Sequence, residues 1–304
     1  MNQRFESSAK KIEQLQNILI RERRERNMKK DDSKSIRMPS NRNNNGFLKV
    51  FCRVKPKKGG YNPPSMFKYL DDGKSFTIKD PRSFTEQINE VFENSAKSSA
   101  EERKKNSPEI FTFNDIFAKE ENNMEVYRRV CLEPIGDLFG PSKGNNKNLL
   151  FFTYGLKLTG KTFTYVGGGD DEGILPLAIV QIFNNAKDQN IALTCSYIEV
   201  KDEKVYDLLS PEKKEIFIIE EDRKFKIPEA TKTDIKELKD FQYAFDQGER
   251  AKSLQKSIFN PNSSVSHTIF RIDLNSEYGI SFSVSIVDLC GLDLSQIPDE
   301  NNLQ

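Results

Sequence analysis

Long apolar segments are missing from this chain of 304 residues. No apolar run approaches the ~20 residues that a membrane-spanning helix needs. The N-terminal residues are charged and do not resemble a secretory signal. Both absences argue against a membrane protein and a secreted one, so we expect a soluble intracellular protein with no membrane partner.

Cysteine and histidine are scarce. The four cysteines, Cys52, Cys131, Cys195 and Cys290, are far apart, and no two of them form a CxxC pair. The one histidine, His267, cannot complete a zinc set with them. We therefore expect buried free thiols of a reducing compartment and interpret His267 as a hydrogen-bonded structural residue.

The chain also lacks an excess of one charge, since 47 Lys and Arg against 46 Asp and Glu give a net charge of +1. This balance argues against a chain that is basic all over, and we expect no nucleic-acid partner, although a local basic patch is compatible with it. A hydrophobic content of 36% is enough to bury one large α/β domain or two small ones.

A glycine-rich loop is the most informative segment. It follows a continuous apolar run, Leu149–Tyr154, which predicts a strand buried on both faces. The loop fits G-x-x-x-x-G-K-[ST], in which backbone N–H groups cradle phosphates, the Lys reaches the terminal phosphates and the Thr binds Mg²⁺. We favour a phosphate site over a fortuitous surface turn. The predicted nucleotide-binding residues here are Gly155, Leu156, Lys157, Leu158, Thr159, Gly160, Lys161, Thr162 and Phe163.

Strands and helices alternate around this loop. Residues 1–46 form a charged extension, helical in part between about Ser8 and Met28, and residues 94–107 are a surface insertion. The predicted helices are 124–139, 173–183 and 238–254. The predicted strands are 47–54, 75–79, 111–113, 149–154, 191–200, 204–209, 267–274 and 280–287, with a hairpin of 216–219 and 225–227. This order indicates a three-layer α/β sandwich: a mostly parallel mixed sheet with helices on both faces.

Two further stretches support the nucleotide site. Asn260–His267 is a cluster of hydroxyls before a strand, and Val287–Gly291 places Asp288 and Gly291 at the end of another. In P-loop NTPases such an Asp holds the Mg²⁺ shell and such a glycine N–H senses the γ-phosphate.

These motifs together resemble the kinesin motor domain, from about residue 47 to 293. Arg53–Pro56 is similar to its adenine-side motif, Phe111–Phe117 to its Phe-x-Phe-Asp-x-Val-Phe stretch, and Tyr154–Thr164 to its phosphate loop. Ser196–Leu209 resembles a further family block, and Asn260–His267 and Asp288–Asp293 match the two switches. Phe152–Leu156 and Gly173–Pro176 most resemble the kinesin-6, or central-spindle, group.

The resemblance implies a P-loop NTPase sandwich of kinesin type that binds ATP and Mg²⁺. Arg53 and Pro56 would flank adenine, and Thr162, Asp288 and Ser264 would hold Mg²⁺. Ser263, Ser264 and Gly291 would surround the γ-phosphate as catalytic groups, although capping of a helix or turn is an alternative for the serines. The implied function is ATP-driven movement on microtubules, with tubulin and spindle proteins as partners, in the cytoplasm and on the spindle in cytokinesis.

Three residues depart from the family pattern. The switch arginine and glutamate that pair in kinesins are here Val265 and Asp293, so that ion pair cannot form. Leu158 stands where a small residue is usual, at a position where positive φ or close backbone approach favours glycine. We expect slow or absent hydrolysis with phosphate binding retained.

Only a short polar tail, 294–304, follows the second switch, so we expect the motor domain, 47–293, to be incomplete. The family's next segments contact microtubules, which predicts weak track binding, chiefly through the hairpin near residues 222–224. Two alternatives stay open. One is a non-hydrolysing, nucleotide-dependent binding module on the spindle, and the other is an incomplete gene model, which sequencing of the transcript's 3′ end would test.

Overall fold

The computed structural model describes residues 10, 12–18, 21, 48–55, 67–78, 110–118, 120–140, 148–221, 224–252, 254–255, 263–264, 266–275 and 281–291. The chain divides into two compact units, Ser35–Glu121 and the remainder, Met1–Lys34 with Asn122–Gln304. The insertion predicted at 94–107 and the tail at 294–304 lie outside the described residues.

The smaller unit contains two short sheets. β1 (Phe51–Arg53) pairs in parallel with β5 (Asp115–Phe117), and β2 (Phe67–Tyr69), β3 (Ser75–Ile78) and β4 (Ile110–Thr112) form an antiparallel sheet. Phe76 is buried and stacks on Phe111 and Phe113, each with a ring-centroid distance of 5.6 Å. Aromatic stacking therefore holds this small sheet together. The strand predicted at 75–79 is confirmed as β3.

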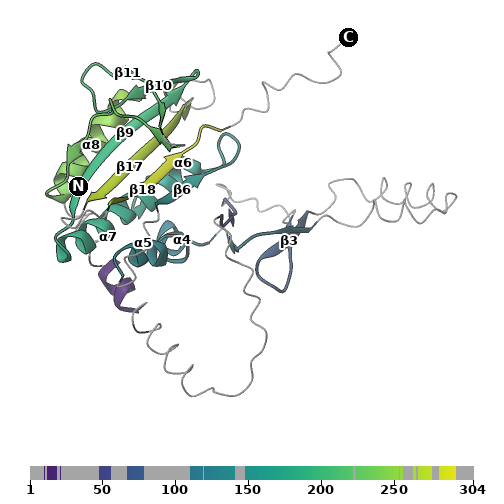
Figure 1. Cartoon of the computed structure of the whole chain (residues 1–304). Coiled ribbons are helices and arrows are strands. Elements are labelled where there is room, and N and C mark those ends of the chain that lie inside the picture. The colour runs from purple at the N-terminus through teal and green to yellow at the C-terminus, as the bar shows by residue number, and fades with distance from the viewer. Residues whose placement is uncertain are drawn as a thin grey trace, which may run out of the picture. The chain divides into compact units, whose positions relative to one another are not determined.

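The larger unit is built on one mixed sheet. Its strands lie in the order β11 (Glu215–Ile216), β10 (Lys204–Asp207), β9 (Ala192–Lys201), β17 (His267–Asn275), β18 (Ser281–Asp288) and β6 (Leu149–Thr153), with β14 (Thr233–Asp234) also on β9 (Figure 1). Among these strands only β18 and β6 pair in parallel. The α/β class with a mixed sheet is confirmed, but the prediction of a mostly parallel sheet is wrong. Short connections join β9 to β10 and β17 to β18, and such connections produce antiparallel pairs.

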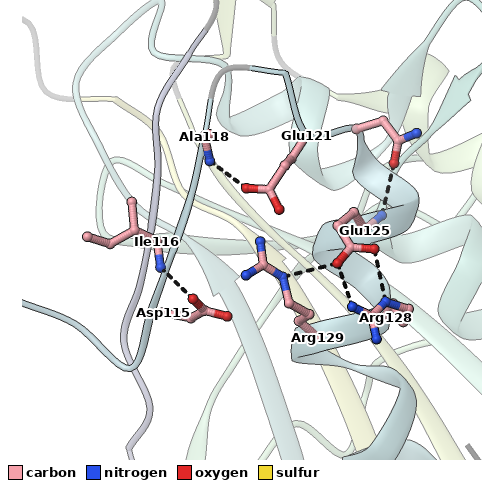
Figure 2. Close-up of polar contacts among 8 residues, drawn as sticks. Asp115, Ile116, Ala118, Glu121, Glu125, Arg128 and Arg129 are labelled. Carbon is pink, nitrogen blue, oxygen red and sulfur yellow. Dashed lines mark hydrogen bonds and ion pairs between the residues drawn. The ribbon is translucent and has the colours of Figure 1, made fainter. Parts of the chain in front are cut away.

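Besides the helical residues 12–18, the larger unit contains α4 (Asn123–Val130), α5 (Leu132–Leu138), α6 (Lys161–Tyr165), α7 (Ile174–Asp188) and α8 (Leu238–Ala251). The Asn122 side chain caps α4 by accepting the Glu125 N–H at 2.9 Å, and Glu125 forms ion pairs with Arg128 and Arg129 (Figure 2). The single helix predicted at 124–139 is two helices. Pro134 lacks the N–H that would continue the hydrogen-bond ladder from α4.

Figure 2 also shows the end of the smaller unit, where the Ala118 N–H donates to the Glu121 carboxylate.

The remaining short strands are β7 (Gly167–Gly168), β8 (Asp171–Glu172), β12 (Ile219–Glu221), β13 (Lys224–Lys226), β15 (Leu254–Gln255) and β16 (Ser263–Ser264). The predicted hairpin is present as β12 and β13, but it begins later than expected, because Ile216 belongs to β11 and pairs with β10.

One face of the large sheet carries the helices. Phe270 of β17 packs against Phe241 of α8 with a centroid distance of 4.9 Å, and Phe282 of β18 contacts Phe139, which ends α5, at 6.0 Å. Gln181 of α7 donates to the Leu132 carbonyl of α5 at 2.9 Å. The described helices thus form one layer over the central strands.

The opposite face differs from the prediction. Leu150 and Phe152 of β6 are 61% and 48% exposed. They alternate with Leu149, Phe151 and Thr153, which point toward the helices. Within the described residues, therefore, one face of β6 is exposed, whereas the apolar run predicted burial on both faces.

Gly248 shows how closely α8 lies on the sheet. A Cβ atom added there would lie 2.1 Å from Cδ1 of the Tyr197 ring. We expect Gly248→Ala to lower the free energy of unfolding by about 1–3 kcal/mol, because helix and strand would have to separate. Urea unfolding followed by circular dichroism measures this. Gly136→Ala in α5 is the control, since its nearest atom is 3.6 Å away, and it should be neutral or stabilising by up to ~1 kcal/mol. Equal effects of the two changes would contradict this packing.

Part of the N-terminal extension packs on the larger unit. Residues 12–18 are helical, Ile12 is fully buried, and Gln16 Nε2 donates to Asn185 Oδ1 of α7 at 3.0 Å. No helix among the described residues has the length and apolar character needed to cross a bilayer.

All four cysteines are free thiols, as predicted. Burial was predicted for all of them, but it holds only for Cys131 and Cys195. Cys52 and Cys290 are half-buried. Burial raises the pKa of Cys195 to about 12 and raises that of Cys131 further.

Candidate nucleotide-binding site

The glycine-rich loop joins β6 to α6 in the larger unit. Gly155 has φ 152° and Gly160, at the N-cap of α6, has φ 96°, which is backbone that side chains with a Cβ rarely adopt. The Leu156 carbonyl accepts hydrogen bonds from Thr159 Oγ1 at 2.8 Å and from Lys161 Nζ at 2.7 Å. Two side chains of the loop therefore share the Leu156 carbonyl as an acceptor, and the Lys161 ammonium lies against the loop backbone.

Lys161 is half-buried. It lies near Asp288, the last residue of β18, and near Cys290, which follows that strand. Burial lowers the pKa of Lys161, and the nearby Asp288 and Cys290 oppose that shift. A half-buried ammonium with one carbonyl partner has two further hydrogens to donate. It is thus placed to bind an anion entering the loop.

Asp288 ends β18 directly beside the loop and is only 2% exposed. Its carboxylate accepts from Thr162 Oγ1 at 2.9 Å and from Thr153 Oγ1 at 3.2 Å. Burial raises the pKa of Asp288, while the Thr162 hydrogen bond, Lys252, the Thr153 hydrogen bond and Lys161 oppose the rise. The structure thus brings together two of the predicted metal ligands, Thr162 and Asp288.

These two groups fit Mg²⁺. A hydroxyl and a carboxylate are hard oxygen donors, and protein Mg²⁺ sites commonly use one or two such groups with water and substrate phosphates. No cluster of three acidic, His or Cys side chains exists in the described part of the chain. A hydroxyl and a carboxylate suit a metal–nucleotide complex, in which phosphates and water supply the other oxygens.

Gly291 lies against the loop. A Cβ there would be 2.5 Å from the Lys157 backbone nitrogen and 2.6 Å from Lys161 Nζ, so only glycine fits without movement. The segment after β18 thus approaches the loop as closely as a backbone can. The predicted role of Gly291 toward the γ-phosphate stays a prediction.

The other predicted site residues either have no described contact with the loop or lie outside the described residues. Ser263 and Ser264 form β16 and pair with Gln255 and Leu254 of β15. Arg53 belongs to the smaller unit, where its guanidinium donates to the Glu121 carbonyl at 3.3 Å. Pro56, Val265 and Asp293 lie outside the described residues. The Phe163 carbonyl accepts from the buried Asn123 side chain at 3.0 Å, which ties α6 to α4.

The sequence did not single out Thr153, Lys252 and Glu249. The Lys252 side chain is 4% exposed and its Nζ lies 3.0 Å from Glu249 Oε1, which also accepts the Tyr197 hydroxyl. Its charge opposes the raised pKa of Asp288. A lysine at the end of an amphipathic helix is an ordinary surface feature, so the pattern gave no signal. A threonine ending a strand before a phosphate loop was the one available hint.

Leu158 occupies left-handed backbone, with φ 66°, as its position in the loop predicted. A residue with a Cβ loses about 1–2 kcal/mol there. Because the side chain is 60% exposed, its removal costs little burial. We expect Leu158→Gly to raise the free energy of unfolding by about 1 kcal/mol, measured by urea unfolding. Leu156→Gly, nearby without positive φ, should lower it by a similar amount. A loss of stability in both variants would contradict strain at Leu158.

Comparisons with known proteins agree with this geometry. A family model, described as the kinesin motor domain, matches residues 73–300. Kinesin-like protein KAR3 of Saccharomyces cerevisiae is 26% identical over 316 residues, which cover 94% of this chain and 38% of that protein. Human centromere-associated protein E is 32% identical over 197 residues, covering 60% of this chain and 7% of that protein.

The fold is also similar to that of a solved fast kinesin, with a TM-score of 0.62 and 22% identity, covering 83% of this chain and 68% of the other. The chain spans less than two fifths of the length of the two curated relatives. Since the family model matches most of its residues, the chain belongs to the kinesin motor-domain family.

Proposed function

We propose that the chain binds ATP with Mg²⁺ at the glycine-rich loop and couples that binding to ATP-driven movement on microtubules. The observation that carries the proposal is the 2.9 Å hydrogen bond from Thr162 to Asp288, which joins the loop to the end of β18. A phosphate loop and a carboxylate from a neighbouring strand are the two parts that P-loop NTPases use for a metal–nucleotide complex.

The residues have distinct roles in this proposal. Lys161 leaves the Leu156 carbonyl and donates to the terminal phosphates, and the N–H groups of the loop bind the phosphate oxygens. Thr162 and Asp288 hold Mg²⁺, with Ser264 as the further proposed ligand. When bound, Mg²⁺ would supply positive charge against the phosphates. Gly291, Ser263 and Ser264 would act on the γ-phosphate, and Arg53 and Pro56 would contact the adenine.

We further propose that hydrolysis is slow. Val265 and Asp293 replace the pair that closes the site in kinesins, and such ordered polar groups are each worth on the order of a hundredfold in rate. The second candidate function, a nucleotide-dependent binding module that does not hydrolyse ATP, is favoured by the same two residues and by the strained Leu158.

The kinesin-6 resemblance of Phe152–Leu156 and Gly173–Pro176 supports a role on the central spindle during cytokinesis. Tubulin and spindle proteins are the proposed partners. Imaging of a tagged full chain through division tests this, and a signal that never coincides with microtubules would contradict it.

Two measurements separate the candidates. Titration with a fluorescent ATP analogue, with and without Mg²⁺, reports binding, and phosphate release with added microtubules reports turnover. Binding with stimulated release supports the motor, whereas binding without stimulation supports the second candidate. Absence of Mg²⁺-dependent binding would overturn the nucleotide site itself.

Asp288→Asn tests the metal site. Because burial raises the pKa of Asp288, its ionised form is disfavoured in the folded state, and a neutral amide of the same shape removes that cost. We expect a higher melting temperature without ligand, together with at least about tenfold weaker Mg²⁺-dependent ATP binding. Thermal unfolding and the fluorescent titration measure the two effects.

Asp273→Asn is the matched control on β17. Asp273 is buried too, but it pairs with Arg271 at 2.7 Å and with Lys232 at 3.1 Å. Its replacement should lower stability and leave the Mg²⁺ effect on ATP binding unchanged. If Asp288→Asn binds ATP with normal Mg²⁺ dependence, Asp288 is not a metal ligand.

A further inference from the structure

A pocket of about 370 Å³ lies at the end of the sheet where β9 begins. Its lining residues come from α7, from the start of β9 and from the segment leading into α8. Figure 1 labels these three elements. Its lining residues are Phe183, Ala186, Lys187, Ile191, Leu193, Ile235, Lys236, Glu237 and Leu238. None of them belongs to the nucleotide site, so the pocket is a separate feature of the larger unit.

The floor of the pocket is apolar. Ala186, Leu193 and Ile235 are buried, and Phe183 and Leu238 are half-buried beside them. The backbone here is fixed, because the Ile235 N–H donates to the Leu193 carbonyl at 2.9 Å and β14 pairs with β9. The volume is within the range of about 300–1,000 Å³ that is usual for small-molecule sites.

The rim is positively charged. Lys187 and Lys236 are exposed, and neither ammonium group has a carboxylate within 4 Å in the described part of the chain. The one acidic lining residue, Glu237, is engaged elsewhere: it caps α8 and forms an ion pair with Lys239 at 2.8 Å. Two ammonium groups with no carboxylate partner among the described residues thus belong to the lining of a largely apolar pocket.

We propose that this pocket binds a small soluble amphipathic anion, with an aromatic or alkyl body on the floor and an acidic head between Lys187 and Lys236. The apolar body of the ligand would remove water from Phe183 and Leu238. Its acidic head would supply a negative charge to pair with the two ammonium groups. The inference is independent of the proposed motor function, because it uses no residue of the loop.

Anilinonaphthalenesulfonate is a suitable probe, and N-phenylnaphthylamine is its matched control because it has the same rings without the acidic group. With the full chain we expect the sulfonate to bind about tenfold more tightly than the neutral compound. The double change Lys187→Glu with Lys236→Glu should remove that preference. Lys201→Glu, at the far end of the ten-residue β9 and roughly 30 Å away, should keep it. Equal binding of both probes would overturn the acidic-head assignment.

The absence of tryptophan allows the ligand to be located. Phe183→Trp places a single indole in the pocket, and Phe225→Trp places one on the exposed β13 hairpin. The sulfonate should protect only Trp at 183 from quenching by iodide. Protection at both positions, or at 225 alone, would overturn the site. Co-sedimentation with anionic phospholipid vesicles that depends on Lys187 and Lys236 would overturn the choice of a soluble ligand. In every variant, thermal unfolding and ATP titration report the fold and the nucleotide site separately.

Discussion

Lys161→Met is expected to weaken ATP binding by at least about thirtyfold while the protein stays folded. The Lys161 ammonium is half-buried and turned into the loop, where its one described partner is the Leu156 carbonyl at 2.7 Å. Truncating one partner of a buried, hydrogen-bonded charge pair costs about 2–5 kcal/mol, and every 1.4 kcal/mol is tenfold in affinity. Methionine keeps the apolar stem of the side chain, so the change removes mainly the charge.

The measurement is a titration with a fluorescent ATP analogue, with circular dichroism to verify the fold. Lys157→Met is the matched control, since it removes the same charge from the same loop. Lys157 is among the predicted nucleotide-binding residues of the loop. A loss of about tenfold or less would assign it a minor role. If Lys161→Met binds ATP as tightly as the parent chain, the loop is not the nucleotide site.

Local patterns predicted most of the elements around this site. The apolar run before the loop became β6, and the glycines of the loop adopt positive φ. The strands that carry His267 and Asp288 lie within one residue of the predicted ranges 267–274 and 280–287. These features depend on neighbouring residues: a glycine is needed where φ is positive, and a strand shows its period over a few residues. The match of Leu158 to a strained position also followed from the motif alone.

Features that depend on partners far along the chain could not be predicted in this way. Strand direction in the sheet depends on pairs such as β9 with β17, whose residues are more than 60 positions apart. The alternation of apolar residues within one strand does not indicate whether its neighbour runs parallel or antiparallel. The exposed side of β6 was missed for the same reason, since an apolar run indicates burial but not which neighbour provides it.

The buried Lys252 illustrates the limit for the site. Its sequence context is that of a surface helix, and its burial beside Glu249 results from the packing of α8 on β9, where Gly248 allows the Tyr197 ring to approach. Such a residue is recognised only when the helix is seen in place.

The double change Val265→Arg with Asp293→Glu is expected to raise microtubule-stimulated ATP turnover by about a hundredfold. In kinesins these positions carry an arginine and a glutamate whose ion pair closes the site around the attacking water. Preorganised polar groups of this kind contribute about 10²–10³ in rate. The expectation requires that the backbone on either side of each position is already held in place.

For position 265 the described residues on both sides are held by contacts, and for position 293 the nearest described residue is Gly291. Ser264 pairs with Leu254 of β15, and Ser266 is buried and donates to Glu199, which Lys213 holds at 2.6 Å. Position 265 therefore lies between two anchored residues. Gly291, two residues before Asp293, is fixed against the Lys157 backbone.

Phosphate release in the presence of microtubules measures the effect, and a double-mutant cycle assigns it to the pair. Each single change should raise ATP turnover only slightly, because an arginine opposite a shorter acid, or a glutamate opposite valine, lacks its matched partner. Most of the gain in turnover should therefore appear as coupling between positions 265 and 293. Val265→Met with Asp293→Glu controls for size without charge. A double variant that binds ATP normally but turns over no faster would show that the missing pair is not what limits hydrolysis, and the non-hydrolysing binding module would then be the better account of this chain.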